Sequence, residues 1–339
     1  MAPARDAAPS GAGRQPASTS ALAGGGSWWP WVRRALTLAF FVVVATMLFR
    51  YAGTVNWREV WAAIRAYPWP VLMAAAVLAG ATHLLYSTYD LLGRHYTQHG
   101  LRVATVMKVT FICYAFNLNL GSLVGGVALR YRLYSRLGLS SGQVTRILSL
   151  SMITNWLGYL VLAGLVFTFW PLALPSSIHF NEASVPVLGM SLLAAAASYL
   201  VICGVSRSKV VQLRGVEISL PSLPVALLQV AMSCANWLLM SGVVYLLMPR
   251  ELGFSEVLSV LLIAAVAGVI THVPAGLGVL EAVFVALLSH RVPEGQLLAG
   301  LLTYRALYYL VPFAMAVLLY LLTETHRKSH DALPEIEGT

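Results

Sequence analysis

The sequence predicts an all-α polytopic membrane protein with six spanning helices and two re-entrant helical hairpins in an inverted-topology repeat. Of its 339 residues, 58% are hydrophobic and only 10% are charged, whereas a soluble globular domain carries about 25% charged residues. Two apolar segments are each interrupted by a glycine-rich polar break. Gly125 of the first break aligns with Gly278 of the second, and the same spacing of 153 residues aligns Gln143 with Gln296. This shared spacing indicates an internal duplication.

The two ends of the chain are predicted to lie outside the membrane domain. Residues 1–32 are expected to be a disordered cytoplasmic tail, because most of them are Ala, Gly, Ser or Pro. The membrane domain is expected at residues 33–323, followed by a cytoplasmic tail at 324–339. Its first crossing, residues 33–51, lacks the small-residue cleavage pattern of a signal peptide, so we interpret it as a retained span.

An amphipathic helix is expected at residues 55–67, because Trp57, Trp61 and Ile64 recur at helical spacing. A helix of this kind lies in the membrane interface, and we interpret it as a connector anchored by tryptophan. It leads into the second crossing, at residues 69–92.

The segment 103–140 is predicted to enter the membrane and return to the side that it left. If it crossed fully, Arg130, Arg132 and Arg136 would be carried into or across the bilayer at a cost of about 3 kcal/mol each. A re-entrant hairpin that turns at residues 117–126 avoids this cost.

The remaining segments repeat the same order of elements. Residues 257–292 are predicted to form the second hairpin, because the apolar arms on either side of its break are too short for two crossings of about 20 residues. The other crossings are expected at residues 144–170, 185–205, 224–248 and 296–322.

Loop charge predicts the orientation. With the N-terminus in the cytoplasm, sixteen of the 22 Lys and Arg residues lie inside, five lie outside, and Arg305 is buried in the last span, which obeys the positive-inside rule. Both termini are then cytoplasmic. The repeats, residues 33–170 and 185–322, have opposite orientations, an arrangement typical of transporters.

The second break carries the side chains with the most informative chemistry. Glu281 begins the returning half-helix, and Arg305 lies nine residues into the last span, about 13 Å deep at 1.5 Å per residue. We expect the two to meet near the midplane, either as a structural ion pair or as a site for a phosphate or other polar headgroup. Further candidates for this substrate-binding site are His272, Gly276, Gly278 and Tyr304.

The first break is expected to contribute polar and flexible groups. Asn117 and Asn119 supply amide side chains, and Gly125 and Gly126 allow a ligand to approach the backbone. Arg130 is either a further ligand-binding residue or a charge that obeys the positive-inside rule.

We expect only the second break to carry a buried charge pair. His83 and Asp90 share one face of a crossing, where either a core hydrogen bond or a weak proton relay would explain them.

The sequence does not indicate an enzyme. It contains no Asp-x-Asp pair, no Walker loop and no His-Glu-x-x-His motif, and we expect neither a metal nor a cofactor. The net charge of +9 follows the loops of a membrane protein, so nucleic acid is not an expected partner.

Residues 119–140 (NLGSLVGGVALRYRLYSRLGLS) and 274–281 (PAGLGVLE), followed by Tyr304 and Arg305, resemble the flippase-like transmembrane domain of lysylphosphatidylglycerol synthases. The resemblance covers roughly residues 33–322. Ala275 departs from the Pro-Gly-Gly that family members usually show.

The resemblance implies a stand-alone bacterial inner-membrane protein that moves a polar or aminoacylated phospholipid or glycolipid between leaflets. It does not imply lipid aminoacylation, because the synthase domain is absent from this sequence. The alternative is a membrane-embedded accessory or scaffold subunit for a lipid-modifying enzyme or glycosyltransferase. A transporter is expected to have an open groove that reaches Arg305, whereas a scaffold is expected to have that arginine sealed by Glu281.

Overall fold

A computed structural model of the protein describes residues 57–170, 184–206, 210–213, 216–271, 273 and 276–331. These residues belong to one compact unit, Asn56–Thr339. The predicted tail at 1–32, the predicted first crossing at 33–51 and His272 lie outside the described residues.

Seven helical stretches among the described residues are long and apolar enough to cross a membrane. Five of them match the predicted crossings, and the other two, α5 and α10, are the first arms of the predicted hairpins. The seven stretches are α3 (Trp69–Ser87) with α4 (Tyr89–Thr97), α5 (Val103–Leu120), α7 (Ser141–Phe169), α8 (Ser184–Val205), α9 (Leu223–Leu247), α10 (Phe254–Thr271), and α12 (Glu294–Tyr304) with η3 (Arg305–Leu310) and α13 (Val311–Asp331).

Two shorter features complete the described part of the chain. The predicted amphipathic helix is present as α2 (Trp57–Arg65), which contacts α12. Between α8 and α9, two strands that an all-α fold does not include, β1 (Val210–Leu213) and β2 (Val216–Ser219), pair antiparallel. Both strands are rich in the β-branched residues that favour strands.

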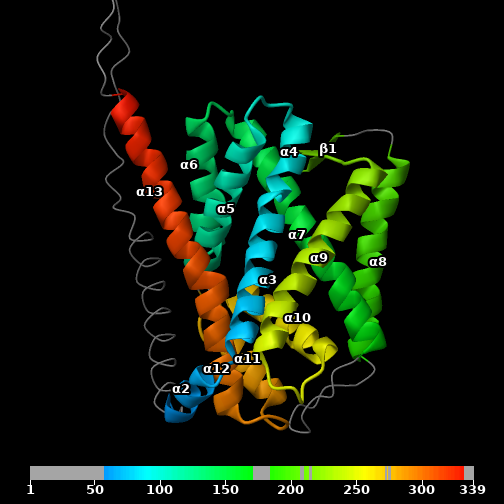
Figure 1. The fold of residues 1–339 in the computed structure, drawn as a ribbon. Coiled ribbons are helices and arrows are strands. Elements are labelled where there is room, and N and C mark those ends of the chain that lie inside the picture. The colour runs from blue at the N-terminus through cyan, green and yellow to red at the C-terminus, as the bar shows by residue number, and fades with distance from the viewer. Residues whose placement is uncertain are drawn as a thin grey trace, which may run out of the picture. The chain divides into compact units, whose positions relative to one another are not determined.

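The first broken segment folds back on itself. Helix α5 ends at Leu120 and is capped by Gly121, whose φ of 86° lies in the left-handed region that glycine tolerates. The chain continues as a π-helical turn, η1 (Ser122–Ala128), and then as α6 (Leu129–Arg136). Figure 1 shows α5 and α6 side by side at one end of the molecule, and the two helices are in contact.

Gly125 and Gly126 allow the two arms of this segment to approach each other. A Cβ atom on Gly125 would lie 2.2 Å from the backbone nitrogen of Asn117, and one on Gly126 would lie 2.8 Å from the Asn117 Oδ1 atom. The space beside these glycines is filled by α5, so in this structure they serve the packing of the two arms. That they let a ligand approach the backbone stays a prediction.

The second broken segment has the same layout at the other end of the molecule. Helix α10 and the shorter α11 (Val279–Leu288) pack together at the end opposite α5 and α6 (Figure 1). Gly276 and Gly278, with φ values of 56° and 76°, lie between them. The spacing of 153 residues also separates two helix starts, since α7 begins at Ser141 and α12 begins at Glu294.

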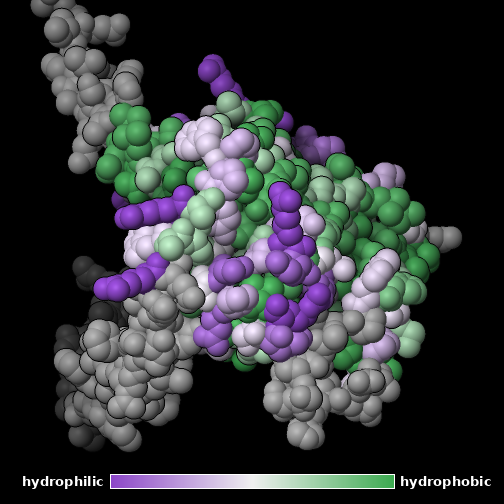
Figure 2. All heavy atoms as spheres, turned by 60° about the horizontal axis from the view of Figure 1, so that its bottom comes forward, coloured by the Kyte–Doolittle hydropathy of each residue, from purple (hydrophilic) through white to green (hydrophobic). Residues whose placement is uncertain are grey.

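Apolar side chains fill the interior and also cover much of the outside. The main core joins α3, α7, α9, α10, α11 and α12. Only 11% of the apolar window of α8 is buried, so most of that helix faces outward, as expected for contact with lipid tails. Figure 2 turns the end with α10 and α11 toward the viewer, and hydrophilic side chains gather there beside large hydrophobic areas.

Candidate functional site

Arg305 and Glu281 form the ion pair that the sequence predicts. The guanidinium Nε of Arg305 donates to Glu281 Oε1, and Nη2 donates to Glu281 Oε2 at 3.0 Å. Nη2 also donates to the carbonyl oxygen of Gly276 at 2.8 Å. The two side chains are only 11% and 9% exposed, so the pair is largely buried within the protein.

Local backbone geometry positions Glu281 for this contact. Gly278, in the left-handed conformation, is the N-cap of α11, which places Glu281 in the first turn of that helix. A carboxylate in a first turn is stabilised by the helix dipole. The break between α10 and α11 thus presents a carboxylate and the Gly276 carbonyl to one guanidinium.

A group of tyrosines lies beside the arginine. The Arg305 guanidinium carbon lies 5.3 Å from the ring centre of Tyr309, within the range of a cation–π contact. Tyr304 and Tyr308 stack with ring centres 5.1 Å apart, and their exposed fractions are 1% and 0%. Tyr304 therefore packs in the core beside Arg305.

A second buried ion pair lies in the first half of the molecule. Arg130 donates from Nε and Nη2 to the two carboxylate oxygens of Asp90, at 3.0 and 3.1 Å. The Tyr134 hydroxyl donates to Asp90 Oδ2 at 2.9 Å, and Arg130 Nη2 reaches Ser151 Oγ at 3.4 Å. Arg130 is 3% exposed and Asp90 is 0% exposed.

This pair corrects two expectations. The prediction that only the second break carries a buried charge pair is wrong, and Arg130 is not a surface charge placed by the positive-inside rule alone. The sequence contained a signal for this pair, because Asp90 is the only acidic residue between Glu59 and Glu182. A lone carboxylate in an apolar crossing needs a basic partner, since an unpaired buried charge is costly.

Aromatic residues connect the two halves between the ion pairs. The hydroxyls of Tyr114 in α5 and Tyr308 in η3 form a buried hydrogen bond of 2.9 Å. Tyr114 stacks on Tyr86 at 3.6 Å, and Tyr86 stacks on Tyr89, the residue before Asp90, at 4.5 Å.

His83 lies within this aromatic group and not against Asp90. Its ring centre is 4.8 Å from that of Tyr308 and 5.1 Å from that of Tyr114. Nδ1 pairs with the carbonyl oxygen of Ala79 at 2.9 Å, whereas Nε2 is buried and has no hydrogen-bond partner among the described residues. The suggested His83–Asp90 hydrogen bond is thus replaced by one to the backbone.

The asparagines that were predicted as site residues at the first break contact other parts of the protein. Asn119 Nδ2 donates to the Ala115 carbonyl at 2.8 Å and to the Tyr309 carbonyl at 3.3 Å, which links the end of α5 to η3. Asn117 lies against Gly126 within the first broken segment. Of the predicted site residues, the structure brings Arg305, Glu281, Gly276 and Gly278 together at the second break. Arg130 instead belongs to the separate pair with Asp90.

This chain is similar to one family of membrane regions and to several known proteins. The family described as "Lysylphosphatidylglycerol synthase TM region" matches residues 34–316. Inner membrane protein YbhN of Escherichia coli is 44% identical over 301 residues, which are 88% of this chain and 95% of YbhN. An uncharacterized protein of Synechocystis sp. is 32% identical over 270 residues, 78% of this chain and 82% of that protein.

A more distant relative carries an additional region. The phosphatidylglycerol lysyltransferase of Staphylococcus haemolyticus is 25% identical over 292 residues, which are 82% of this chain but only 32% of that enzyme. Matches that span most of this chain, together with seven described helices of membrane-crossing length, lead to one assignment. The chain is a multi-span membrane protein that belongs to the lysylphosphatidylglycerol synthase transmembrane-region family.

Proposed function

We propose that this protein is a bacterial inner-membrane flippase or transporter that moves lipids with a polar or aminoacylated headgroup between leaflets. In this proposal six helices cross the membrane, the two broken segments are re-entrant hairpins in inverted repeats, and both termini are cytoplasmic. The proposal assigns no covalent chemistry to the chain.

The observation that carries the proposal is the pair of buried arginines, each held at two points by one carboxylate. Charged residues inside a membrane are rare, and those that occur commonly mark the pathway of a substrate or ion. A guanidinium binds a phosphate with the same two-point geometry that it uses for a carboxylate. Asp90 and Glu281 therefore occupy positions that a lipid phosphate can take when the carboxylate moves away.

The exchange of a carboxylate for a lipid phosphate at each arginine gives a transport step. Arg305 and Arg130 act as two binding stations for the headgroup phosphate, and the hydroxyls of Tyr114 and Tyr308 lie between them. The displaced carboxylate then needs a new cation. An aminoacylated headgroup brings its own ammonium group, so it satisfies the arginine and the carboxylate together.

The scaffold alternative also has an observation in its favour. Arg305 is sealed by Glu281, with 11% of its side chain exposed, which is the arrangement expected of a structural pair. In the transport proposal the same geometry is the closed state, in which the carboxylate occupies the place of the lipid phosphate.

Reconstitution distinguishes the two functions. Vesicles containing the purified chain and fluorescent phospholipids would be assayed for translocation in the native protein and in Arg305→Ala. Arg291→Ala is a matched control, because Arg291 also pairs with a glutamate, Glu256, but is 40% exposed. We expect Arg305→Ala to lower the rate at least about tenfold, the effect of about 1.4 kcal/mol, and Arg291→Ala to leave it near native.

Equal translocation rates for the native chain and Arg305→Ala would contradict the assigned site. No translocation in either protein, combined with stable copurification of a lipid-modifying enzyme, would support the scaffold function.

A further inference from the structure

We infer that His83 is a proton-binding residue at the centre of the molecule, and that its proton accompanies an anionic phospholipid through the transport step. Proton binding stands on the structure alone, whereas its coupling to a lipid rests on the proposed function. His83 is 2% exposed and belongs to neither buried ion pair.

His83 occupies the middle of a predicted crossing. The stretch formed by α3 and α4 runs from residue 69 to residue 97, so residue 83 is 14 residues from either end, about 21 Å at 1.5 Å per residue. Helix α3 contains no Asp, Glu, Lys, Arg or Cys. Histidine is the side chain that ordinarily changes charge between about pH 5 and pH 8, so this helix places one proton acceptor midway through its length.

The hydrogen bond of Nδ1 determines which atom of His83 takes up the proton. Nδ1 lies 2.9 Å from the carbonyl oxygen of Ala79. A carbonyl oxygen only accepts, so Nδ1 carries the hydrogen and Nε2 of the neutral ring has a free lone pair. Nε2 is buried and has no hydrogen-bond partner among the described residues. The proton-binding atom is therefore Nε2.

A second acceptor lies in the same group of side chains. Asn236 on α9 is 1% exposed, and its Oδ1 atom is also buried without a partner in the part of the chain that the structure describes. The Asn236 side chain lies beside the hydroxyl of Tyr114, whose ring centre is 5.1 Å from that of His83. A water molecule has two hydrogens to donate, so we expect one to bind between Nε2 and Oδ1 and to deliver the proton.

Aromatic rings can stabilise the charged form of His83. The ring centres of Tyr308, Tyr114 and Phe111 lie 4.8, 5.1 and 5.9 Å from that of His83, within the range over which an aromatic face attracts a cation. The hydroxyls of Tyr114 and Tyr308 also join α5 to η3. A proton on His83 thus lies where the two halves of the molecule meet.

Four elements pack closely against α3, namely α4, α5, α9 and η3. Tyr114 and Tyr308 face the His83 ring with titratable groups. Cysteine and tyrosine side chains are ordinarily neutral near pH 7, and α9 carries no acidic or basic residue. The acidic and basic residues of the other three elements are Asp90, Arg94 and His95 on α4, Lys108 on α5 and Arg305 on η3.

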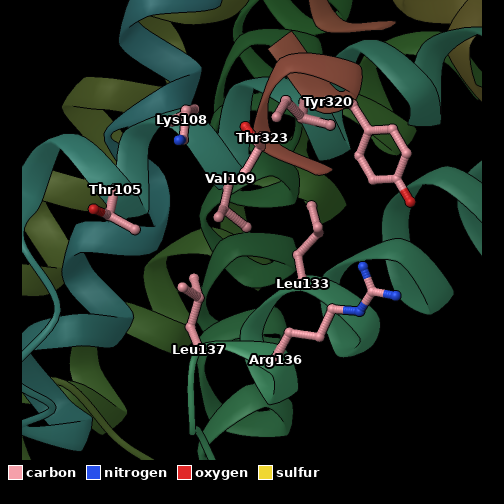
Figure 3. A pocket seen from close by; sticks show the side chains of 9 residues that line it. Thr105, Lys108, Val109, Leu133, Arg136, Leu137, Tyr320 and Thr323 are labelled. Atoms are coloured by element: carbon pink, nitrogen blue, oxygen red, sulfur yellow. The ribbon is translucent and has the colours of Figure 1, made fainter. Parts of the chain in front are cut away.

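These charges are engaged elsewhere. Asp90 and Arg305 belong to the two ion pairs, and Arg94 Nε donates to the carbonyl oxygen of Leu101 at 2.9 Å. Lys108 lines a groove between α5, α6 and α13 (Figure 3), and none of the aromatic residues around His83 lines that groove. The charge at the centre therefore changes when His83 takes up a proton.

Proton binding balances the charge of the proposed transport step. A lipid phosphate that enters beside an arginine and its carboxylate adds one negative charge to the interior, and an uncompensated buried charge is unfavourable. A proton from water on one side adds to Nε2, the imidazole becomes an imidazolium, and the proton returns to water on the other side when the lipid leaves. Phosphatidylglycerol, which has no ammonium group, fits this route.

Nuclear magnetic resonance of the full chain in lipid nanodiscs tests proton binding. The chain has eight histidines, so the ¹⁵N signal of His83 would be assigned by its loss in His83→Gln. We expect Nε2 to change from an unprotonated to a protonated nitrogen between about pH 8 and pH 5. The exposed His95 provides the control His95→Gln, which should leave this signal in place. An Nε2 that stays unprotonated throughout would overturn the inference, whether or not the protein moves lipid.

Vesicles with a gradient of about one pH unit test the coupling. One proton per lipid allows fluorescent phosphatidylglycerol to accumulate up to about tenfold in the leaflet on the alkaline side, measured relative to vesicles without protein. We expect this accumulation for the native chain and His95→Gln. For His83→Gln we expect translocation down a lipid gradient but an even final distribution.

Separate outcomes identify separate failures. An even distribution for a native chain that does translocate lipid would overturn the coupling, and so would an equal loss of translocation in His83→Gln with and without the gradient, which indicates a structural role. A native chain that moves no lipid contradicts the proposed function, and the resonance experiment then decides proton binding. Asn236→Leu keeps the test informative if His83→Gln does not fold, because it retains the imidazole. It should reduce the accumulation, and full accumulation would contradict the water site.

Discussion

Arg130 and Arg305 are each held at two points by one carboxylate, but the partners come from different elements. Arg130 lies on α6, the returning arm of its segment, and pairs with Asp90 of α4. In the second half the carboxylate, Glu281, lies on the returning arm α11, and Arg305 lies on the helix that follows. The two halves thus reach similar chemistry at positions that the 153-residue spacing does not relate.

Asp90→Asn is expected to destabilise the protein strongly. Removing one partner of a buried ion pair leaves the other charge uncompensated, at a cost of about 3–5 kcal/mol. The measurement is the unfolding free energy in mixed micelles. An Asp90→Leu/Arg130→Met double variant should recover part of the loss, and a loss under about 1 kcal/mol for Asp90→Asn would contradict the structural role of the pair.

The hydrogen bond between Tyr114 and Tyr308 is expected to contribute about 1 kcal/mol to stability. Tyr114→Phe and Tyr308→Phe should each lose this contribution, and the double variant should lose little more than either single one, because both changes remove the same bond. A double-mutant cycle in unfolding free energy checks this. Fully additive losses would mean that the two hydroxyls act independently.

At the scale of the elements, the broken segments use glycine for two different reasons. Gly121, Gly276 and Gly278 supply positive φ values at the ends of helices. Gly125 lies within η1, where it permits contact between the arms. The sequence motif therefore sets where helices begin or end at some glycines and allows close packing at others.

Gly125→Ala is expected to separate α6 from α5, because the added methyl carbon would lie 2.2 Å from backbone atoms. Overpacking of a dense interior costs about 1–3 kcal/mol. Gly142→Ala is the matched control, since a Cβ there meets nothing within 4 Å. The thermal unfolding midpoint in detergent should fall for Gly125→Ala only, and similar midpoints for both variants would argue against close packing of the arms.

At the scale of the whole molecule, the two broken segments lie at opposite ends (Figure 1). If both are re-entrant, each opens to a different side of the membrane. A central polar region reached alternately from either side is the arrangement that moves a headgroup across while its chains stay in lipid.

Single cysteines test this topology. Ser135 at the end of α6 and Ser289 after α11 are both exposed. In a background without the native cysteines, Ser135→Cys should react with a membrane-impermeant maleimide only from the cytoplasmic side and Ser289→Cys only from the outside. Labelling of both from one side would refute opposite hairpins.

The sequence by itself determined the features that depend on local composition. Membrane class, the described helices of membrane-crossing length and the two broken segments follow from the length and spacing of apolar runs, which are properties of short stretches. The Arg305–Glu281 pair was also predictable, because few charges lie near the second break and the two are 24 residues apart.

Only the tertiary structure decided which distant groups meet. Asp90 and Arg130 are separated by 40 residues, and Tyr114 and Tyr308 by 194, so their contacts depend on how whole helices pack. The function of Gly125 was hidden for the same reason, since a glycine that admits a ligand and one that admits a neighbouring helix look identical in sequence. Packing distinguishes them, because it decides which atoms occupy the space that the missing side chain leaves.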